Sequence, residues 1–424
     1  MRENHRESLK YTQVFVPGGF PQHTYNPRRE LNLEQKVRQV LENLCKLVTV
    51  TGHTKSGKTV LVRNILRREE AIWIDGGGVG EEEDFWTTVI DQLKLFQMDE
   101  VAQAESSSNN TSLSGKTGIN AVVRSEVTAS RTHGTTHNIS SSQSRAVSSR
   151  VAALAGLREA NRAIVIDDFH YLPRDLQGNL IRALKPLIFD GLPVVIIAIP
   201  HRRYDAVKVE REMTGRILPI VIPPWDKKEL IFIPETGFSI LRGRISQSMS
   251  DTLTQESIGS PHLMQEFCRA VCKAHNIETS FLNGYVDLEK PQLRRVFSDT
   301  AETIGRPIFE KLARGPRQRS DRIQRTPKGG AKVDIYGLVL HALAYIRPGL
   351  VTLEYEDLRS AIRDVSEQEI PQLHEVARVL KHMSDIAATD QSSTPVIDFD
   401  EDEKRLHITD PFFAFYLRWG SLDS

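Results

Sequence analysis

The chain has 424 residues, of which 39% are hydrophobic and 26% are charged, and 55 Lys and Arg balance 55 Asp and Glu. This length suggests about two to four domains, and the composition excludes a peptide-sized or purely disordered product. With only three cysteines, the sequence has no basis for a disulfide framework, and we expect a reducing, cytoplasmic compartment. Residues 1–8 lack the apolar core of a secretory signal, and the longest apolar run, 192–199, is far shorter than the ~18 residues of a membrane span. No membrane partner is expected.

Short apolar runs alternate with helical stretches along the first half of the chain. The runs are 47–51, 71–75, 163–166 and 192–199, and glycine, aspartate or proline follows or ends each of them. Continuous apolar runs of this length are typical of parallel strands buried on both faces. The sequence therefore predicts an α/β fold with a parallel sheet.

The first run leads into a phosphate-binding motif. Gly52-His53-Thr54-Lys55-Ser56-Gly57-Lys58-Thr59 matches G-x-x-x-x-G-K-[ST] between a predicted strand and the helical run 59–66. Its glycines let the backbone turn its N–H groups toward phosphates, Lys58 reaches the β- and γ-phosphates, and the Thr59 hydroxyl binds Mg²⁺. A glycine-rich turn with a chance lysine is the weaker alternative, because motif and context agree.

A segment rich in Ser, Thr and Asn, residues 104–150, interrupts this pattern. Its composition cannot form core. Within it, 119–129 alternates weakly at the strand period, so a disordered loop and a projecting hairpin both remain open.

An acidic pair follows the third run. Asp167 and Asp168 end a buried strand, where a phosphate site needs a carboxylate. We expect Asp167 in the Mg²⁺ shell and Asp168 as the general base that polarises the attacking water. The alternative is an Asp pair that caps the next helix. His170 is expected to be a packing residue.

With these motifs the sequence resembles the AAA+ ATPases and, within them, the origin-recognition-like and signal-transduction (STAND) branch, whose second motif often ends in two acidic residues. The resemblance covers roughly residues 25–280. It implies a P-loop NTPase sheet with a helical lid, ATP and Mg²⁺ as cofactors, and a homo-oligomer. It also implies that the segment Tyr25–Glu30, with an arginine and a glutamate before a helix, packs near the adenine.

Further residues take roles from this resemblance. Arg216, before the apolar run 217–222, stands where the family carries an arginine finger supplied to a neighbouring subunit. Arg211 is the second candidate, and a solvated surface arginine is the alternative. Pro261 is expected to shape the nucleotide pocket, and His262 stands where the family often has a sensor arginine.

Three further positions, one histidine and two cysteines, are also assigned. His201 follows a strand at a place where the family usually has a small polar residue. It either substitutes for that residue or has a helix-capping or surface role. Cys268 and Cys272 lie four residues apart on one helical face without further ligands nearby in the sequence, so we expect them in the core.

The C-terminal part has a strong charge asymmetry. Residues 313–332 carry seven Lys and Arg against the single Asp321, whereas 333–424 carry eight basic against seventeen acidic residues, a difference of nine negative charges.

The C-terminal segment has the predicted element order of a winged helix, closed by an aromatic helix at 410–419. The order is three helices, at 335–345, 355–365 and 369–387, followed by two strands, at 396–399 and 406–409. A DNA-reading winged helix needs basic residues on its third helix and wing, so the acidic charge favours a protein-facing or self-regulatory role. The linker arginines 314, 317, 319, 322 and 325 either follow a phosphate backbone or pair with the acidic domain, and tethering favours the pairing.

These observations predict five segments: an N-terminal extension (1–24), a P-loop ATPase core (25–230) with the insert 104–150, a helical lid (231–312), a basic linker (313–332) and an acidic winged-helix domain (333–424). The expected function is that of a molecular switch that binds and slowly hydrolyses ATP, in a regulatory or defence pathway of a prokaryote, with an effector protein as partner. A nucleic-acid loader and a nucleotide-binding scaffold without hydrolysis are the alternatives.

Overall fold

The computed structural model describes residues 8–42, 45–95, 148–199, 213, 215–281, 284–289, 292–317, 322–328, 331–350, 352–367, 370–388 and 395–422. Most of the insert 104–150 lies outside these residues, as do His201, Arg211 and Arg319. The predictions made for these positions are therefore not addressed by the structure.

A five-stranded parallel sheet forms the centre of the N-terminal half, in the order β2-β3-β4-β1-β5. Its strands are β1 (Leu47–Gly52), β2 (Ile72–Asp75), β3 (Ile164–Asp167), β4 (Val194–Ala198) and β5 (Ile217–Ile222). Leu47 pairs with Val194 on one side and with Ile217 on the other, so β1 lies between β4 and β5. The predicted parallel α/β sheet is confirmed.

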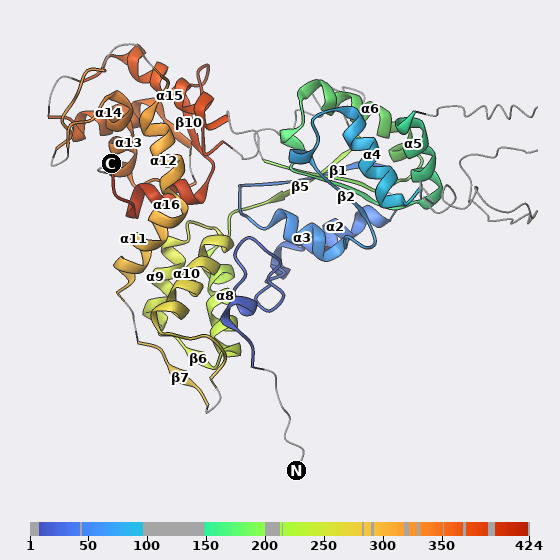
Figure 1. The fold of residues 1–424 in the computed structure, drawn as a ribbon, viewed down its shortest axis with the longest axis horizontal. Coiled ribbons are helices and arrows are strands. Elements are labelled where there is room, and N and C mark those ends of the chain that lie inside the picture. The colour runs from blue at the N-terminus through green and yellow to red at the C-terminus, as the bar shows by residue number, and fades with distance from the viewer. Residues whose placement is uncertain are drawn as a thin grey trace, which may run out of the picture.

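Helices cover both faces of this sheet (Figure 1). One face packs through residues such as Ile74 and Ile166 against α4, α5 and α6, and the other packs through residues such as Val48 and Val165 against α2 and α3. Successive residues of a strand point to opposite faces, which is why uninterrupted apolar runs are needed here. The helices are α2 (Leu33–Arg38), α3 (Lys58–Ile65), α4 (Glu82–Leu93), α5 (Ser149–Ala160) and α6 (Arg174–Phe189).

The predicted lid is a helical body that follows β5. It contains α8 (Lys227–Ile240), β6 (Gly243–Arg244), α9 (Gln247–Glu256), α10 (Pro261–Ala274), β7 (Val286–Asp287), α11 (Leu293–Ile304) and α12 (Arg306–Arg314). The N-terminal segment is part of this body, because α1 (Tyr11–Val14) and the fully buried Phe15 belong to its core. A Cβ on Gly237 of α8 would lie 2.2 Å from the Phe15 ring, so only glycine allows this contact.

The C-terminal segment folds in the predicted order, with one additional strand. Its elements are α13 (Ile335–Ile346), β8 (Thr352–Glu354), α14 (Tyr355–Val365), α15 (Leu373–Ala388), β9 (Ile397–Asp400), β10 (Arg405–Ile408) and α16 (Pro411–Trp419). The three strands form an antiparallel sheet in the order β8-β10-β9. Helix α15 begins later than the predicted residue 369, because Pro371 disfavours helical geometry in the residue before it. The assignment of this segment as a winged helix stays a prediction.

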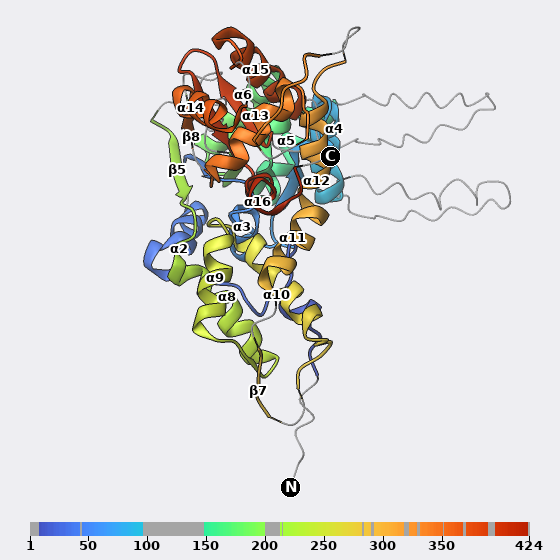
Figure 2. The same ribbon diagram turned by 90° about the vertical axis from the view of Figure 1, so that its left-hand side faces the viewer.

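The lid and the C-terminal segment share one hydrophobic core (Figures 1 and 2). Phe415 of α16 lies 5.0 Å from Phe267 of α10 and 6.0 Å from Phe297 of α11, measured between ring centroids. At the end of the same helix, Trp419 Nε1 donates to Glu256 Oε2 at 2.7 Å. The aromatic helix therefore fastens the C-terminal segment to the lid. In the described parts of the chain, the helices lack the combination of length and apolar character that a membrane span requires.

Candidate nucleotide-binding site

A cavity of about 800 Å³ lies at the carboxyl edge of the parallel sheet, where β1, β3 and β5 end. Among the residues predicted to bind a nucleotide, its walls contain Thr54 to Thr59, Asp167, Asp168 and Pro261. Gly52 and His53 contribute their backbone instead, as described next. The sheet thus brings the phosphate-loop motif, the acidic pair and the lid proline to one place.

Lys58 is the most constrained charged residue of the loop. Its Nζ donates to the carbonyl oxygens of Gly52 and His53, both at 2.9 Å, and only 7% of the residue is exposed. Burial lowers the pKa of Lys58 to about 8, although the carboxylates of Asp168 and Asp167 act in the opposite direction. The ammonium group is therefore held beside the loop, where it needs an anion to balance its desolvation.

Glycine is required at both ends of the loop. Gly57 has a φ of +90°, the left-handed region that glycine adopts without strain, and it caps the N-terminus of α3. A Cβ on Gly52 would lie 2.9 Å from the Ile222 carbonyl oxygen of the neighbouring strand β5. The loop can therefore leave β1 and enter α3 with its backbone N–H groups at the helix N-terminus, a favourable place for an anion.

The acidic pair lies beside the first turn of α3. Thr59 Oγ1 donates to Asp167 Oδ1 at 3.2 Å, and the backbone N–H of Asp168 donates to the same oxygen at 3.0 Å. Burial and then the charge of Asp168 raise the pKa of Asp167 to about 6. Burial also raises the pKa of Asp168, while Lys58 opposes this shift. Two carboxylates and one ammonium group thus share a poorly solvated site.

The position of the acidic pair depends on a close approach by the end of β2. Asp168 has a φ of +50°, and a Cβ on Gly76 would lie 2.5 Å from the Asp168 carbonyl oxygen and 3.1 Å from that of Asp167. Both atoms belong to the backbone and cannot move aside. Gly76 therefore allows the two aspartates to reach the cavity. In the sequence, Gly76 is distinguished only as a glycine that follows an apolar run.

The loop offers hydroxyl groups that fit a phosphate ligand. Thr54 Oγ1 and Ser56 Oγ are buried and have no hydrogen-bond partner in the described parts of the chain. A buried polar atom without a partner is unfavourable, and phosphate oxygens would satisfy such donors. With Lys58, Thr59 and Asp167 adjacent, the residues present fit a nucleotide phosphate with Mg²⁺, which in proteins is bound by one or two carboxylates together with phosphate oxygens.

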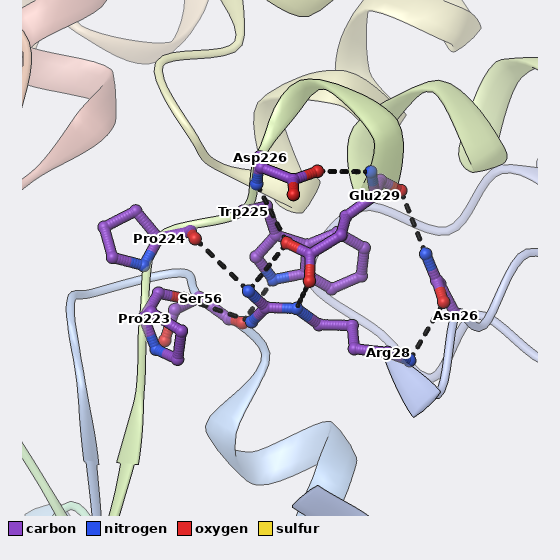
Figure 3. A network of polar contacts seen from close by, with 8 residues as sticks. All are labelled: Asn26, Arg28, Ser56, Pro223, Pro224, Trp225, Asp226 and Glu229. Carbon is purple, nitrogen blue, oxygen red and sulfur yellow. Dashed lines mark hydrogen bonds and ion pairs between the residues drawn. The ribbon is translucent and has the colours of Figure 1, made fainter. Parts of the chain in front are cut away.

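Arg28 forms a buried polar network on the other wall of the cavity (Figure 3). Its guanidinium pairs with both carboxylate oxygens of Glu229 on α8, at 2.8 and 2.7 Å, and donates to the carbonyl oxygens of Pro223 and Pro224 at 3.0 and 3.2 Å. The guanidinium also lies 5.0 Å from the centroid of the Trp225 ring. Within the segment Tyr25–Glu30, Tyr25 to Arg28 line the cavity, whereas Arg29 and Glu30 are exposed, and its packing near an adenine stays a prediction.

The C-terminal segment also reaches the cavity. Lys55 Nζ lies 5.0 Å from the centroid of Phe412, next to Asp410, and the His262 ring contacts the same phenylalanine edge-on with centroids 4.8 Å apart. Asp410 caps α16 by accepting from the N–H groups of residues 412 and 413, and burial raises its pKa. No local pattern connects positions 55 and 412, so this contact could not be read from the sequence.

The other predicted residues occupy the following places. Arg216 lies at the amino edge of the sheet, where its carbonyl oxygen accepts from the Leu47 N–H at 2.9 Å and its guanidinium lies 5.3 Å from the Phe189 ring centroid. This edge is opposite to the one that carries the phosphate loop. Cys268 and Cys272 are fully buried in the lid core, as expected. His170 is also buried and packs against Tyr171.

Comparison with known proteins adds evidence on the fold. Neither a protein-family model nor a curated protein matches the sequence. Among solved structures, the chain is similar to the Walker-type ATPase PABY2304 of Pyrococcus abyssi, with 15% sequence identity, 91% of this chain and 94% of that chain covered, and a TM-score of 0.52. It is also similar to the Aeropyrum pernix ORC2 protein in ADPNP-ADP complexes (13% identity, 97% and 98% covered, TM-score 0.49) and to Cdc6p of Pyrobaculum aerophilum (14% identity, 96% and 97% covered, TM-score 0.44).

The first of these similarities extends over nearly the full length of both chains. Because PABY2304 shares only 15% of its residues with this chain, this similarity concerns the fold. The chain therefore has the fold of a Walker-type, P-loop ATPase.

Proposed function

We propose that this protein binds ATP with Mg²⁺ in the cavity at the carboxyl edge of the sheet and hydrolyses it slowly. The observation that carries this proposal is the convergence of Lys58, Thr59, Asp167 and Asp168 on one cavity, with the buried donors of Thr54 and Ser56 beside them. The fold similarity to a protein described as a Walker-type ATPase supports the same activity.

Each residue has a distinct part in this proposal. Lys58 leaves the carbonyl oxygens of Gly52 and His53 and contacts the β- and γ-phosphates, which balance its buried charge. Thr59 and Asp167 would hold Mg²⁺, which when bound neutralises charge on the phosphate oxygens. Asp168 accepts a proton from the attacking water, and its raised pKa suits a general base. Pro261 closes the lid side of the cavity.

Arg216 is assigned to a neighbouring subunit's site. Five residue steps along β1 separate the amino edge near Arg216 from the phosphate loop, roughly 16 Å at the rise of a strand. An arginine at that edge cannot serve its own phosphates, but it can complete the site of an adjacent copy in a homo-oligomer. Arg211 remains the second candidate for this role.

The shared core of lid and C-terminal segment supports a switch as the biological role. Movement of the lid on nucleotide exchange carries α16 and the acidic segment with it, and these present a changed surface to an effector protein. We place such a switch in a regulatory or defence pathway of a prokaryote, in the cytoplasm.

The linker arginines bear on the nucleic-acid loader alternative. Arg322 pairs with Asp334, and Arg325 lies 3.8 Å from Glu375, both partners belonging to the acidic segment. This pairing favours the switch over the loader.

Phosphate release from Mg·ATP by the purified full-length chain, with Lys58→Ala as the control, tests the proposed ATP hydrolysis. Binding of ATP without turnover in any assembled form would instead support the scaffold alternative.

A further inference from the structure

Trp225 connects the wall that holds Arg28 to the phosphate loop (Figure 3). Its indole Nε1 donates to the Ser56 carbonyl oxygen at 2.9 Å, across 169 positions of the sequence. The ring also lies against Gly57, the residue after Ser56, because a Cβ on this glycine would be 4.0 Å from Trp225 Cζ2. The indole therefore contacts the peptide that joins Ser56 to Gly57, directly before the lysine of the loop.

The orientation of this peptide decides where one phosphate-binding donor points. In a planar trans peptide the C=O of one residue and the N–H of the next point in opposite directions. Since the Ser56 C=O points at the indole, the Gly57 N–H points away from Trp225. A free Ser56–Gly57 peptide can rotate, and glycine permits more such rotations than any other residue. The hydrogen bond from Trp225 removes this freedom before a ligand arrives.

The indole is itself held from several sides. The backbone N–H of Trp225 donates to the Gly259 carbonyl oxygen at 3.1 Å, just before α10, and Asp226 caps α8 by accepting from the Glu229 N–H at 2.8 Å. The Arg28 guanidinium covers the ring, and four of its five N–H donors are committed to Glu229 and to the two proline carbonyls. Arg28 is 6% exposed. With its donors occupied, Arg28 is suited to hold Trp225 in place and not to contact a phosphate.

The geometry points to Trp225 as a positioning residue for the phosphate loop. The Arg28–Glu229 pair fixes the indole, the indole fixes the Ser56–Gly57 peptide, and this peptide aims the Gly57 N–H for phosphate binding. The arrangement ties the N-terminal segment and the first turn of the lid helix α8 to the geometry of the loop. The inference rests on the proposed function, since it gives that site its preorganisation.

Trp225→Phe tests this inference in the full-length chain, because phenylalanine keeps a ring under Arg28 and lacks the N–H. The matched control is Trp73→Phe. Trp73 Nε1 likewise donates to a backbone carbonyl, that of Leu66 at 3.0 Å, and Arg68 lies 5.9 Å from its ring centroid, but this residue does not line the cavity. The two variants therefore lose the same kind of hydrogen bond in two different places.

Two measurements show whether Trp225→Phe affects the phosphate loop and Trp73→Phe does not. The first is hydrogen exchange of the Ser56 amide, which donates within the loop to His53 O at 3.3 Å, in the nucleotide-free chain. The second is the Kd for ADP with Mg²⁺. A typical hydrogen bond corresponds to a roughly 3- to 10-fold effect, so Trp225→Phe should speed the exchange and weaken ADP binding by about that factor, whereas Trp73→Phe should change neither.

Wild-type values for Trp225→Phe in both measurements would overturn the inference, and so would equal losses in both variants, which would indicate a general effect on stability. A wild-type chain that binds no ADP would contradict the proposed function. Faster exchange of the Ser56 amide only in Trp225→Phe would even then support the positioning role, so the two failures are distinguishable.

Discussion

The side-chain oxygens of Thr59 and Asp167 lie 3.2 Å apart, although 108 positions separate the two residues in the sequence. Thr59 follows β1 and Asp167 ends β3, and β4 lies between these strands. Because all three strands run in parallel, their carboxyl ends meet at one edge, and the two motifs meet there as well. This hydrogen bond joins the phosphate loop to the acidic pair, and several predictions concern the groups around it.

Lys58→Ala should weaken binding of ATP without unfolding the sheet. The variant loses a charge-assisted contact worth roughly 1.5–3 kcal/mol, which corresponds to a roughly 10- to 150-fold higher Kd. Titration calorimetry with Mg·ATP measures the Kd, and the melting temperature of the nucleotide-free variant is the control. An unchanged Kd would remove Lys58 from the phosphate site.

Asp168→Asn should behave differently, because the amide cannot accept the proton of the attacking water. We expect ATP binding close to that of the wild type and turnover slower by roughly 10²- to 10⁴-fold, the usual contribution of a general base. Single-turnover phosphate release measures this step. Turnover at the wild-type rate would show that another group acts as the base.

Asp167→Asn should stabilise the nucleotide-free chain at neutral pH. The pKa of Asp167 is raised from 3.8 to about 6 in the folded state, so the folded chain holds this proton more tightly than the unfolded chain. Stability therefore falls as pH rises from about 4 to about 6, and the ionised group costs on the order of 1–3 kcal/mol above that window. Asparagine carries no such charge, and its Oδ1 can still accept from Thr59 and from the Asp168 N–H.

The melting temperature of both chains between pH 4 and pH 8 tests this expectation. The advantage of the variant should be largest above pH 6 and should disappear near pH 4. Mg·ADP should reverse the order, because it should stabilise the wild type more than Asp167→Asn. A variant that is less stable than the wild type at pH 7 without nucleotide would contradict the sign of the pKa effect.

Gly76→Ala should disable the site from a position outside the recognised motifs. The new methyl group would lie 2.5 Å from the Asp168 carbonyl oxygen, so the backbone that carries both aspartates must move. We expect turnover to fall at least roughly 10-fold, since small displacements of positioned groups are costly in catalysis. Gly78→Ala is the matched control, because a Cβ there meets no atom of the described structure within 4 Å. Equal turnover in the two variants would show that the approach of β2 is unimportant.

The sequence predicted the parts of the site that are local or that depend on strand ends. The phosphate loop and the acidic pair carry their own motifs, and the parallel sheet guarantees that strand ends share an edge. Even the start of α8 has a local signal, because Asp226 and Glu229 form a capping box with the spacing D-x-x-E. These features need no knowledge of how the distant segments pack.

The remaining parts depend on packing between segments with no recognisable pattern. Arg28 meets Glu229 across 201 positions, and the spacing of the capping box gives no hint that the same glutamate also pairs with an arginine. Lys55 meets Phe412 because α16 packs on the lid, which follows from the shared core and not from any motif. The contact of residues 1–24 with the lid likewise has no local pattern. The sequence therefore assigned these residues to an extension, although Phe15 is fully buried in the lid.

Arg216 is predicted to act across a subunit boundary. Mixing Arg216→Ala subunits with Lys58→Ala subunits should restore turnover, because some shared sites then combine an intact loop with an intact arginine. Each variant alone should be inactive, and sizing of the mixture shows whether oligomers form. Oligomers without restored turnover would point to Arg211 or to a role of Arg216 within its own subunit, such as its contact with Phe189.

The linker arginines are predicted to be bound by the acidic segment and not by DNA. The guanidinium of Arg322 pairs with Asp334 and lies 4.4 Å from the Tyr336 ring centroid, and Arg325 lies 3.8 Å from Glu375. Lys381 on α15, the third helix of the C-terminal segment, is likewise paired with Glu401 of the turn between β9 and β10. Basic groups that are already neutralised cannot release counterions from DNA without first breaking these pairs.

Measuring DNA binding by the full-length chain over a range of salt concentrations shows whether these arginines contact DNA or the acidic segment. If DNA contacts these arginines, Arg322→Gln/Arg325→Gln should reduce the slope of log K against log salt by about 0.9 for each lost phosphate contact, close to 2 for both. If the acidic segment holds them, the slope should stay unchanged and the double variant should instead melt at a lower temperature. Arg317→Gln, at an exposed position of the same linker, is the control for charge alone. A slope reduced by the double variant and not by Arg317→Gln would overturn the internal pairing and support a nucleic-acid loader.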